Sequence, residues 1–330
     1  MKRFLNFISE ADDQDERKGY LIEAKSGESY NDEHAHVHVW NHMVKKGIAH
    51  DKDAMLKEIE KAKTDKKHAL HFDNAKDAGF TGGKKTSAAK VSYHKELETA
   101  VHTVHALANH PDFKKAVKEK HVAHVMGGER GVVSDTWKKH KAIQGGTSKA
   151  DIRIENPTSK KGEGLRLSMK KGGGSQLMSG GPEENAATHD HAAREMLSNH
   201  PKYKNLPQKK KEEIHAGIMR DMHNVGKHLN AMKTANKEDM QKHRKLGQMH
   251  MDSTHDRHPE LNHFLRKEAT TGEGKFGKGS QHAASYLVKS SSGSKSATVT
   301  HVNDYNHEGT RPRIALPKGK NRSGNVKLDE

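Results

Sequence analysis

The chain contains no cysteine, few aromatic residues and no long apolar run. Among its 330 residues, aromatic residues account for 5% and apolar residues for 31%. The absence of cysteine excludes disulfides, thiolate-bound zinc and a cysteine nucleophile. No window reaches membrane-spanning length, and the N-terminus lacks the apolar centre of a secretory signal, so we expect a soluble protein with no membrane partner. The small apolar share indicates a compact domain with polar extensions.

Positive charge is in clear excess. Lysine and arginine number 59 against 43 acidic residues, which gives a formal net charge of +16. Such a balance favours polyanions, above all DNA, because basic side chains neutralise phosphates and release counterions. The alternative is a lysine-rich soluble surface, since the charge is spread along the chain rather than gathered in one arm.

Two short segments near the middle of the chain alternate apolar and polar residues. They cover residues 151–154 and 165–169, and the turn-rich stretch 156–162 separates them. A period of two is typical of strands, so the pattern predicts a hairpin. One face of the second strand would carry Leu165, Leu167 and Met169, and the other Arg166, Ser168 and Lys170. Asp151, at the start of the first strand, could face the serine and the lysine.

The run from Lys149 to Gly181 resembles the PD-(D/E)XK nuclease superfamily. The motifs that carry the resemblance are Asp151, then Ser168-Met169-Lys170, then GGGSQLMSGG. It covers roughly residues 130–200, with a weaker echo at 268–276. The resemblance implies an α/β fold with a mixed central sheet flanked by helices, as in restriction endonucleases. It also implies Mg²⁺-dependent hydrolysis of DNA phosphodiester bonds.

The superfamily's roles can be carried over to individual residues. Asp151 would be the metal ligand, Ser168 would occupy the usual acidic position, and Lys170 would be the catalytic lysine. Gln176 would assist from the glycine-rich turn. The chemistry needs these types, because carboxylates provide hard oxygen ligands and a lysine adds compact positive charge beside phosphate. The structural alternative is that Asp151 merely begins a strand and that the lysines form a solvated edge.

Ser168 departs from the superfamily pattern, because serine is a poor magnesium ligand compared with a carboxylate. Either another carboxylate compensates or the site is weakened or inactive. In the superfamily that the chain resembles, a compensating glutamate often comes from the preceding helix. Glu33, Glu96 and Glu98 are the candidates, and Glu33 and Glu96 are the predicted additional metal ligands.

The N-terminal segment MKRFLNFISEA resembles the capsid-targeting peptide of head-internal proteins in large contractile-tailed phages. Such peptides end at a prohead-protease site of the form Leu/Ile-x-Glu before a small residue. Residues 8–10 before Ala11 and residues 21–23 before Ala24 fit that form. The resemblance implies a partner in the capsid or prohead protease and a place inside the virion head. The alternative is a short amphipathic helix that docks on the domain.

Histidine is abundant, with 28 copies. His34, His38 and His42 are four residues apart, so on a helix they would share one face. Pairs at this spacing can bind zinc or another transition metal, but the chain has no HExxH motif. We expect adventitious metal binding here rather than catalytic zinc.

The remaining patterns predict further elements. Helices are expected at 31–46, 51–67, 93–109, 183–197, 208–234 and 236–250, and strands at 283–288 and 296–302. The helix at 51–67 carries Glu/Lys pairs typical of a solvent-facing helix. Met219, Met222 and Leu229 would form a packing stripe.

These observations predict three regions: a leader over 1–27, a nuclease-like α/β domain over 28–310 with a helical insertion at about 200–265, and a basic tail over 311–330. The predicted function is that of a metal-dependent, nuclease-like phage protein acting on DNA, in the virion head or the host cytoplasm. One alternative is a non-catalytic head-internal structural or DNA-binding protein with a degenerate nuclease fold. Another is an injected protein that engages host defence enzymes.

Overall fold

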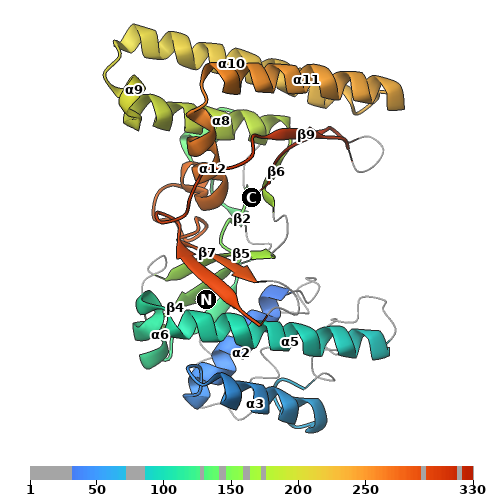
Figure 1. The fold of residues 1–330 in the computed structure, drawn as a ribbon, viewed down its shortest axis with the longest axis vertical. Helices are drawn as coiled ribbons and strands as arrows, with labels where there is room; N and C mark the ends of the chain where they lie inside the picture. The colour runs from blue at the N-terminus through green and yellow to red at the C-terminus, as the bar shows by residue number, and fades with distance from the viewer. Residues whose placement is uncertain are drawn as a thin grey trace. The chain divides into compact units, whose positions relative to one another are not determined.

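A computed structural model describes residues 32–71, 86–126, 130–140, 146–158, 164–171, 176–290, 295–317 and 322–329. The expected leader, with both candidate protease sites, lies outside the described residues, and so do residues 172–175 of the glycine run. The chain divides into two compact units (Figure 1). Each unit is made of several separate stretches of the sequence.

Unit 1 comprises Met1–Gly128, Ala150–Gly172 and Tyr286–Thr300. Its helices are α2 (Asp32–Lys46), α3 (Lys52–Thr64), α5 (Thr86–Asn109), the 3₁₀ helix η2 (Pro111–Phe113) and α6 (Lys114–Lys118). Its strands are β1 (Val122–Val125), β4 (Ile152–Glu155), β5 (Leu165–Lys171), β7 (Tyr286–Ser290) and β8 (Ala297–His301). The helices expected at 31–46, 51–67 and 93–109 are therefore confirmed as α2, α3 and α5.

The strands of unit 1 form one mixed sheet in the order β1-β4-β5-β7-β8. β4 pairs antiparallel with both β1 and β5, whereas β5 and β7 run parallel. The hairpin predicted around the turn-rich stretch is thus β4–β5, and the two later strands return to the same sheet as expected. An α/β unit with a mixed sheet and flanking helices is confirmed.

The apolar face of this sheet packs on the helices below it in Figure 1. Ile152, Ile154 and Leu167 belong to one core cluster with residues of α2 and α5. Phe113 contacts Trp40 and Tyr286 edge-to-face, with ring centroids 6.4 Å and 5.0 Å apart. The alternation that the sequence displays therefore follows from a sheet with one face buried on helices.

Local sequence explains where the helices of this layer begin and end. Asp51 caps α3, since its carboxylate accepts a hydrogen bond from the Ala54 amide at 2.9 Å. Asn41 on α2 pairs with both the amide and the carbonyl of Ala123, at 2.8 and 3.1 Å, and so satisfies backbone groups on the edge strand β1. One face of α3 is buried, and it includes Glu58. The helix is therefore not simply solvent-facing.

Unit 2 comprises Glu129–Lys149, Gly173–Ser285 and His301–Glu330. Its helices are α7 (Asp135–Lys138), α8 (Pro182–Asn199), α9 (Pro201–Lys204), α10 (Gln208–Ala231), α11 (Lys237–Arg257), α12 (Leu261–Thr271) and α13 (Glu273–Phe276). Its strands are β2 (Arg130–Gly131), β3 (Gly146–Thr147), β6 (Gln176–Gly180), β9 (Arg313–Ala315) and β10 (Asn325–Asp329).

Three helices of unit 2 lie where the sequence predicts helices. α8, α10 and α11 match the predicted segments, and α10 packs on both of the others (Figure 1). In the methionine stripe, Met222 and Leu229 are fully buried, and Met219 is partly buried. Gly272 ends α12 in the left-handed conformation with φ of 66°, which glycine adopts without steric cost.

The segment expected as a basic tail contributes structure of its own. β10 pairs antiparallel with both β6 and β9, in the order β6-β10-β9. Ile314, Val326 and Leu328 are buried in the core of unit 2, so apolar burial outweighs the basic composition here. Within the described residues, no helix combines the length and apolar character needed to cross a bilayer.

Candidate functional site

The β4–β5 hairpin determines where the predicted site residues lie. Ile152 pairs with Leu167 and Ile154 with Leu165, so these apolar side chains share the face that packs on the core. Side chains one position along point to the opposite face. That face receives Ser168 and Lys170 from β5, and Asp151 lies directly before β4.

Asp151, Ser168 and Lys170 form a hydrogen-bonded row. The Ser168 hydroxyl donates to Asp151 Oδ2 at 3.3 Å, and the Met169 amide donates to the same oxygen at 2.6 Å. Lys170 Nζ donates to Ser168 Oγ at 2.8 Å and to the Met169 carbonyl at 3.3 Å. The fold therefore places a carboxylate and an ammonium group on either side of one hydroxyl.

Burial limits what this row can bind. Ser168 is only 2% exposed, whereas Asp151 and Lys170 are half-buried. Mg²⁺ usually keeps several waters and binds through one or two carboxylates plus substrate phosphates. A single carboxylate in a partly open environment therefore suits Mg²⁺ better than a closed set of protein ligands would. The hydroxyl of Ser168 links the two charged groups instead of supplying a second anionic ligand.

The other predicted site residues come from α2, α5 and β6. Glu33 lies at the start of α2 and Glu96 on α5, and both side chains are half-buried. Glu98, also on α5, forms an ion pair with Lys63 at 3.0 Å. In the described part of the chain, no three acidic or imidazole groups that include Asp151 have ligand atoms within 4.8 Å of one another. Gln176 begins β6 in unit 2, and its side chain lies outside what the structure describes.

Basic residues lie in register on the polar face of the sheet. Arg153 on β4 pairs with Arg166 on β5, and Lys170 pairs with Lys289 on β7. Arg153 is buried and donates to Glu155 at 3.0 Å. Burial, and secondarily the charge of Arg153, lowers the pKa of His124 to about 4, so this histidine adds no charge near neutral pH. Arg166, Lys170 and Lys289 are the partly exposed basic side chains of this face.

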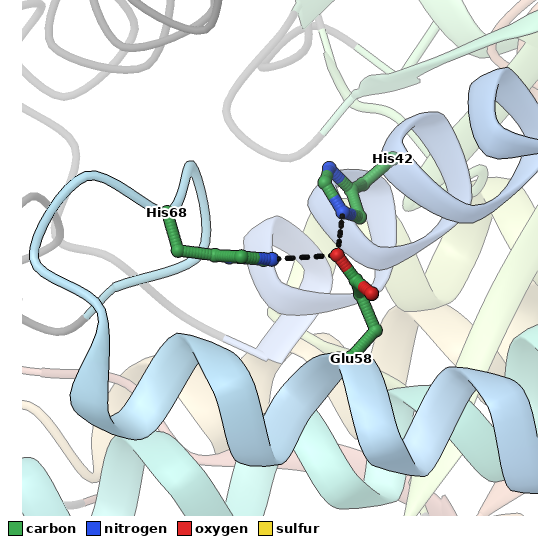
Figure 2. A group of neighbouring side chains, drawn as sticks. All are labelled: His42, Glu58 and His68. Carbon is green, nitrogen blue, oxygen red and sulfur yellow. Dashed lines mark hydrogen bonds and ion pairs between the residues drawn. The ribbon is translucent and has the colours of Figure 1, made fainter.

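Sequence reasoning missed a second group, which consists of His42, Glu58 and His68. Figure 2 shows both imidazole rings directed at one oxygen of Glu58. The three side chains could hold a metal ion, since their ligand atoms all lie within 4.8 Å of one another. His42 belongs to the predicted histidine face, but His34 and His38 do not join this group. The signal for Glu58 was weak, because its helix carries the Glu/Lys pattern of an exposed one.

Comparisons with known proteins identified no relative of this chain. No family model, curated protein or solved structure matches the chain.

Proposed function

We propose that this protein is a Mg²⁺-dependent, nuclease-like protein that hydrolyses DNA phosphodiester bonds. The observation that carries the proposal is the row of Asp151, Ser168 and Lys170, drawn from two paired strands. The mixed sheet, with an acidic residue before one strand and a lysine on the next, supports a restriction-endonuclease-like fold. It is the arrangement implied by the resemblance to the PD-(D/E)XK superfamily.

The residues of the row have separate roles. Asp151 would provide a carboxylate ligand for Mg²⁺, which usually binds proteins through one or two carboxylates. When bound, Mg²⁺ polarises the scissile phosphate and lowers the pKa of a coordinated water. Lys170 lies one hydroxyl away from that carboxylate, where its ammonium group orients the attacking water or neutralises charge on the phosphate. Ser168 positions Lys170, because its hydroxyl accepts the ammonium hydrogen bond.

Charge supports DNA as the substrate. The net charge of +16 favours binding to phosphate, and the polar face of the unit 1 sheet brings further basic residues beside Lys170. The predicted contributions of Glu33, Glu96 and Gln176 belong to the same proposal. So does packaging in the virion head, which rests on the leader motif and on a prohead protease as partner.

The proposal is tested by incubating the protein with supercoiled plasmid DNA after removal of bound metals. We expect nicked or linear products with added Mg²⁺ and none with EDTA, because the site needs the cation to stabilise charge on the phosphate. Ca²⁺ serves as the matched control, since it binds carboxylates with longer and less ordered contacts. Equal cleavage with EDTA would contradict the metal-dependent mechanism.

A second function, non-catalytic DNA binding by a degenerate nuclease fold, is favoured by a specific observation. Asp151 Oδ2 already accepts hydrogen bonds from the main chain and from Ser168, and position 168 supplies no second carboxylate. This alternative requires DNA affinity that falls steeply with salt, together with intact plasmid at every Mg²⁺ concentration. A filter-binding titration over a range of NaCl concentrations, run beside the cleavage assay, distinguishes the two functions.

A further inference from the structure

Three segments of unit 1 converge at His42, Glu58 and His68. His42 comes from α2, Glu58 from α3, and His68 from the turn that follows α3. Their side chains are 7%, 7% and 9% exposed. The carboxylate thus lies between two imidazoles in a nearly closed space, as Figure 2 shows.

The spacing of the ligand atoms suits a small tetrahedral metal. Glu58 Oε1 lies 3.4 Å from His42 Nε2 and 2.9 Å from His68 Nε2. Zinc bonds of about 2.0–2.1 Å in a tetrahedral shell separate neighbouring ligand atoms by roughly 3.3 Å. The two separations from Glu58 lie on either side of that value, and all three ligand atoms lie within 4.8 Å of one another.

The ligand types select the class of metal. Two imidazoles and one carboxylate suit Zn²⁺ and related transition metals, whereas Mg²⁺ and Ca²⁺ prefer oxygen-only shells. Hydrogen bonds from Lys46, His68 and His42 outweigh the effect of burial, which alone would raise the pKa of Glu58, and hold that pKa well below its usual range. The carboxylate is therefore ionised at neutral pH, as metal ligation requires.

We propose that His42, Glu58 and His68 form a zinc-binding site that fastens the segment after α3 to α2. This segment also contacts α5, because the Tyr93 hydroxyl donates to the Leu70 carbonyl at 2.9 Å. The site is separate from Asp151 and does not depend on the nuclease proposal. Its role is to hold these segments of unit 1 together.

Lys46 competes with the metal for the same oxygen. Its ammonium group pairs with Glu58 Oε1, and its side chain is 44% exposed, so it can move into solvent when zinc enters. Binding also requires a change at His68. Its Nδ1 accepts a hydrogen bond from the Leu70 amide at 3.2 Å, so Nε2 carries the proton in the metal-free ring. For zinc to bind Nε2, that proton must move to Nδ1, and the Leu70 amide must give up His68 as its acceptor.

Cobalt and zinc titrations test the proposal on the full-length protein after chelator treatment. We expect one Co²⁺ equivalent to produce the strong visible absorption of a tetrahedral site, and zinc to abolish it. Glu58→Gln should weaken zinc binding at least 100-fold, as judged by competition with a chromophoric chelator. His50→Ala, which removes an exposed histidine from the same unit, should leave the affinity unchanged.

Lys46→Met separates a metal site from a buried ion-pair cluster. If the group binds zinc, removing the competing cation should tighten zinc binding at least threefold, and zinc should raise the melting temperature of this variant. Unchanged or weaker zinc binding by Lys46→Met would overturn the proposal. So would equal zinc affinities for the wild type and Glu58→Gln, with circular dichroism confirming that both are folded.

Discussion

Replacement of Asp151 by asparagine is expected to lower Mg²⁺-dependent DNA cleavage by about 10³-fold or more. Loss of the only carboxylate in the row removes the anionic ligand, and metal stabilisation of a phosphoryl transition state is worth several kcal/mol, with about 1.4 kcal/mol for each factor of ten. Asparagine retains a side-chain oxygen that can accept the Met169 amide, so the hairpin should keep its register. Single-turnover cleavage of a labelled duplex measures the effect.

Matched control variants distinguish a loss of catalysis from the effect of a change in net charge. Asp53→Asn removes an exposed carboxylate from the same unit and should cleave DNA like the wild type. Lys170→Met should lose cleavage by about 10²-fold, as expected for a group that orients water, whereas Lys57→Met, at an exposed position on α3, should not. Asp151→Asn that cleaved as fast as Asp53→Asn would show that Asp151 only begins a strand.

Mild acid is expected to destabilise unit 2 by about 4 kcal/mol between pH 7.5 and pH 5. His189 and His255 are fully buried, with ring centroids 5.7 Å apart. Burial lowers the pKa of His189 to about 4, and burial reinforced by neighbouring positive charge lowers the pKa of His255 to about 3. In the unfolded chain both titrate near 6.5.

The sign of this effect follows from proton linkage. Below pH 6.5 the two histidines are protonated in the unfolded state but stay neutral in the folded state. The free energy of unfolding therefore decreases as the pH falls towards 4. At pH 5 each histidine contributes about 2 kcal/mol to the loss. Because domains are stable by only about 5–15 kcal/mol, the shift in the unfolding transition should be large.

Urea unfolding monitored by tryptophan fluorescence measures this loss. Trp40 lies in unit 1 and Trp137 in unit 2, so a Trp40→Phe background leaves a probe for unit 2 alone. His255→Leu should reduce the acid-induced loss by about 2 kcal/mol, since one titrating ring is gone. His223→Gln, at an exposed position of α10, should behave like the parent. Equal pH dependence in all three proteins would contradict the buried, neutral pair.

The hairpin and its contacts could be predicted from sequence because their signals are local. Strict alternation in 152–154 and 165–169 determines which side chains share a face, and this alone places Ser168 beside Lys170. The start of β4 beside β5 then brings Asp151 to the same place. The catalytic role of the three residues stays a prediction.

Other features depend on contacts between residues distant in sequence. Glu58 is on a helix rich in charged residues, and nothing local indicates that His68 folds back onto it. The composition of the C-terminal segment is basic, yet Ile314 and Leu328 are buried in a core that the helices of unit 2 form. The division into two units was not predicted either, because each unit is assembled from stretches that are distant in the sequence.

The most direct test of the central claim is the position of a divalent cation relative to Asp151. Crystals of the protein with a DNA duplex, soaked in Mn²⁺ as a substitute for Mg²⁺, should show an anomalous peak about 2.0–2.2 Å from an Asp151 oxygen, with Lys170 beside the same phosphate. Anomalous density at other sites, such as the His42–Glu58–His68 group, with none at Asp151 would contradict the proposed hydrolytic site.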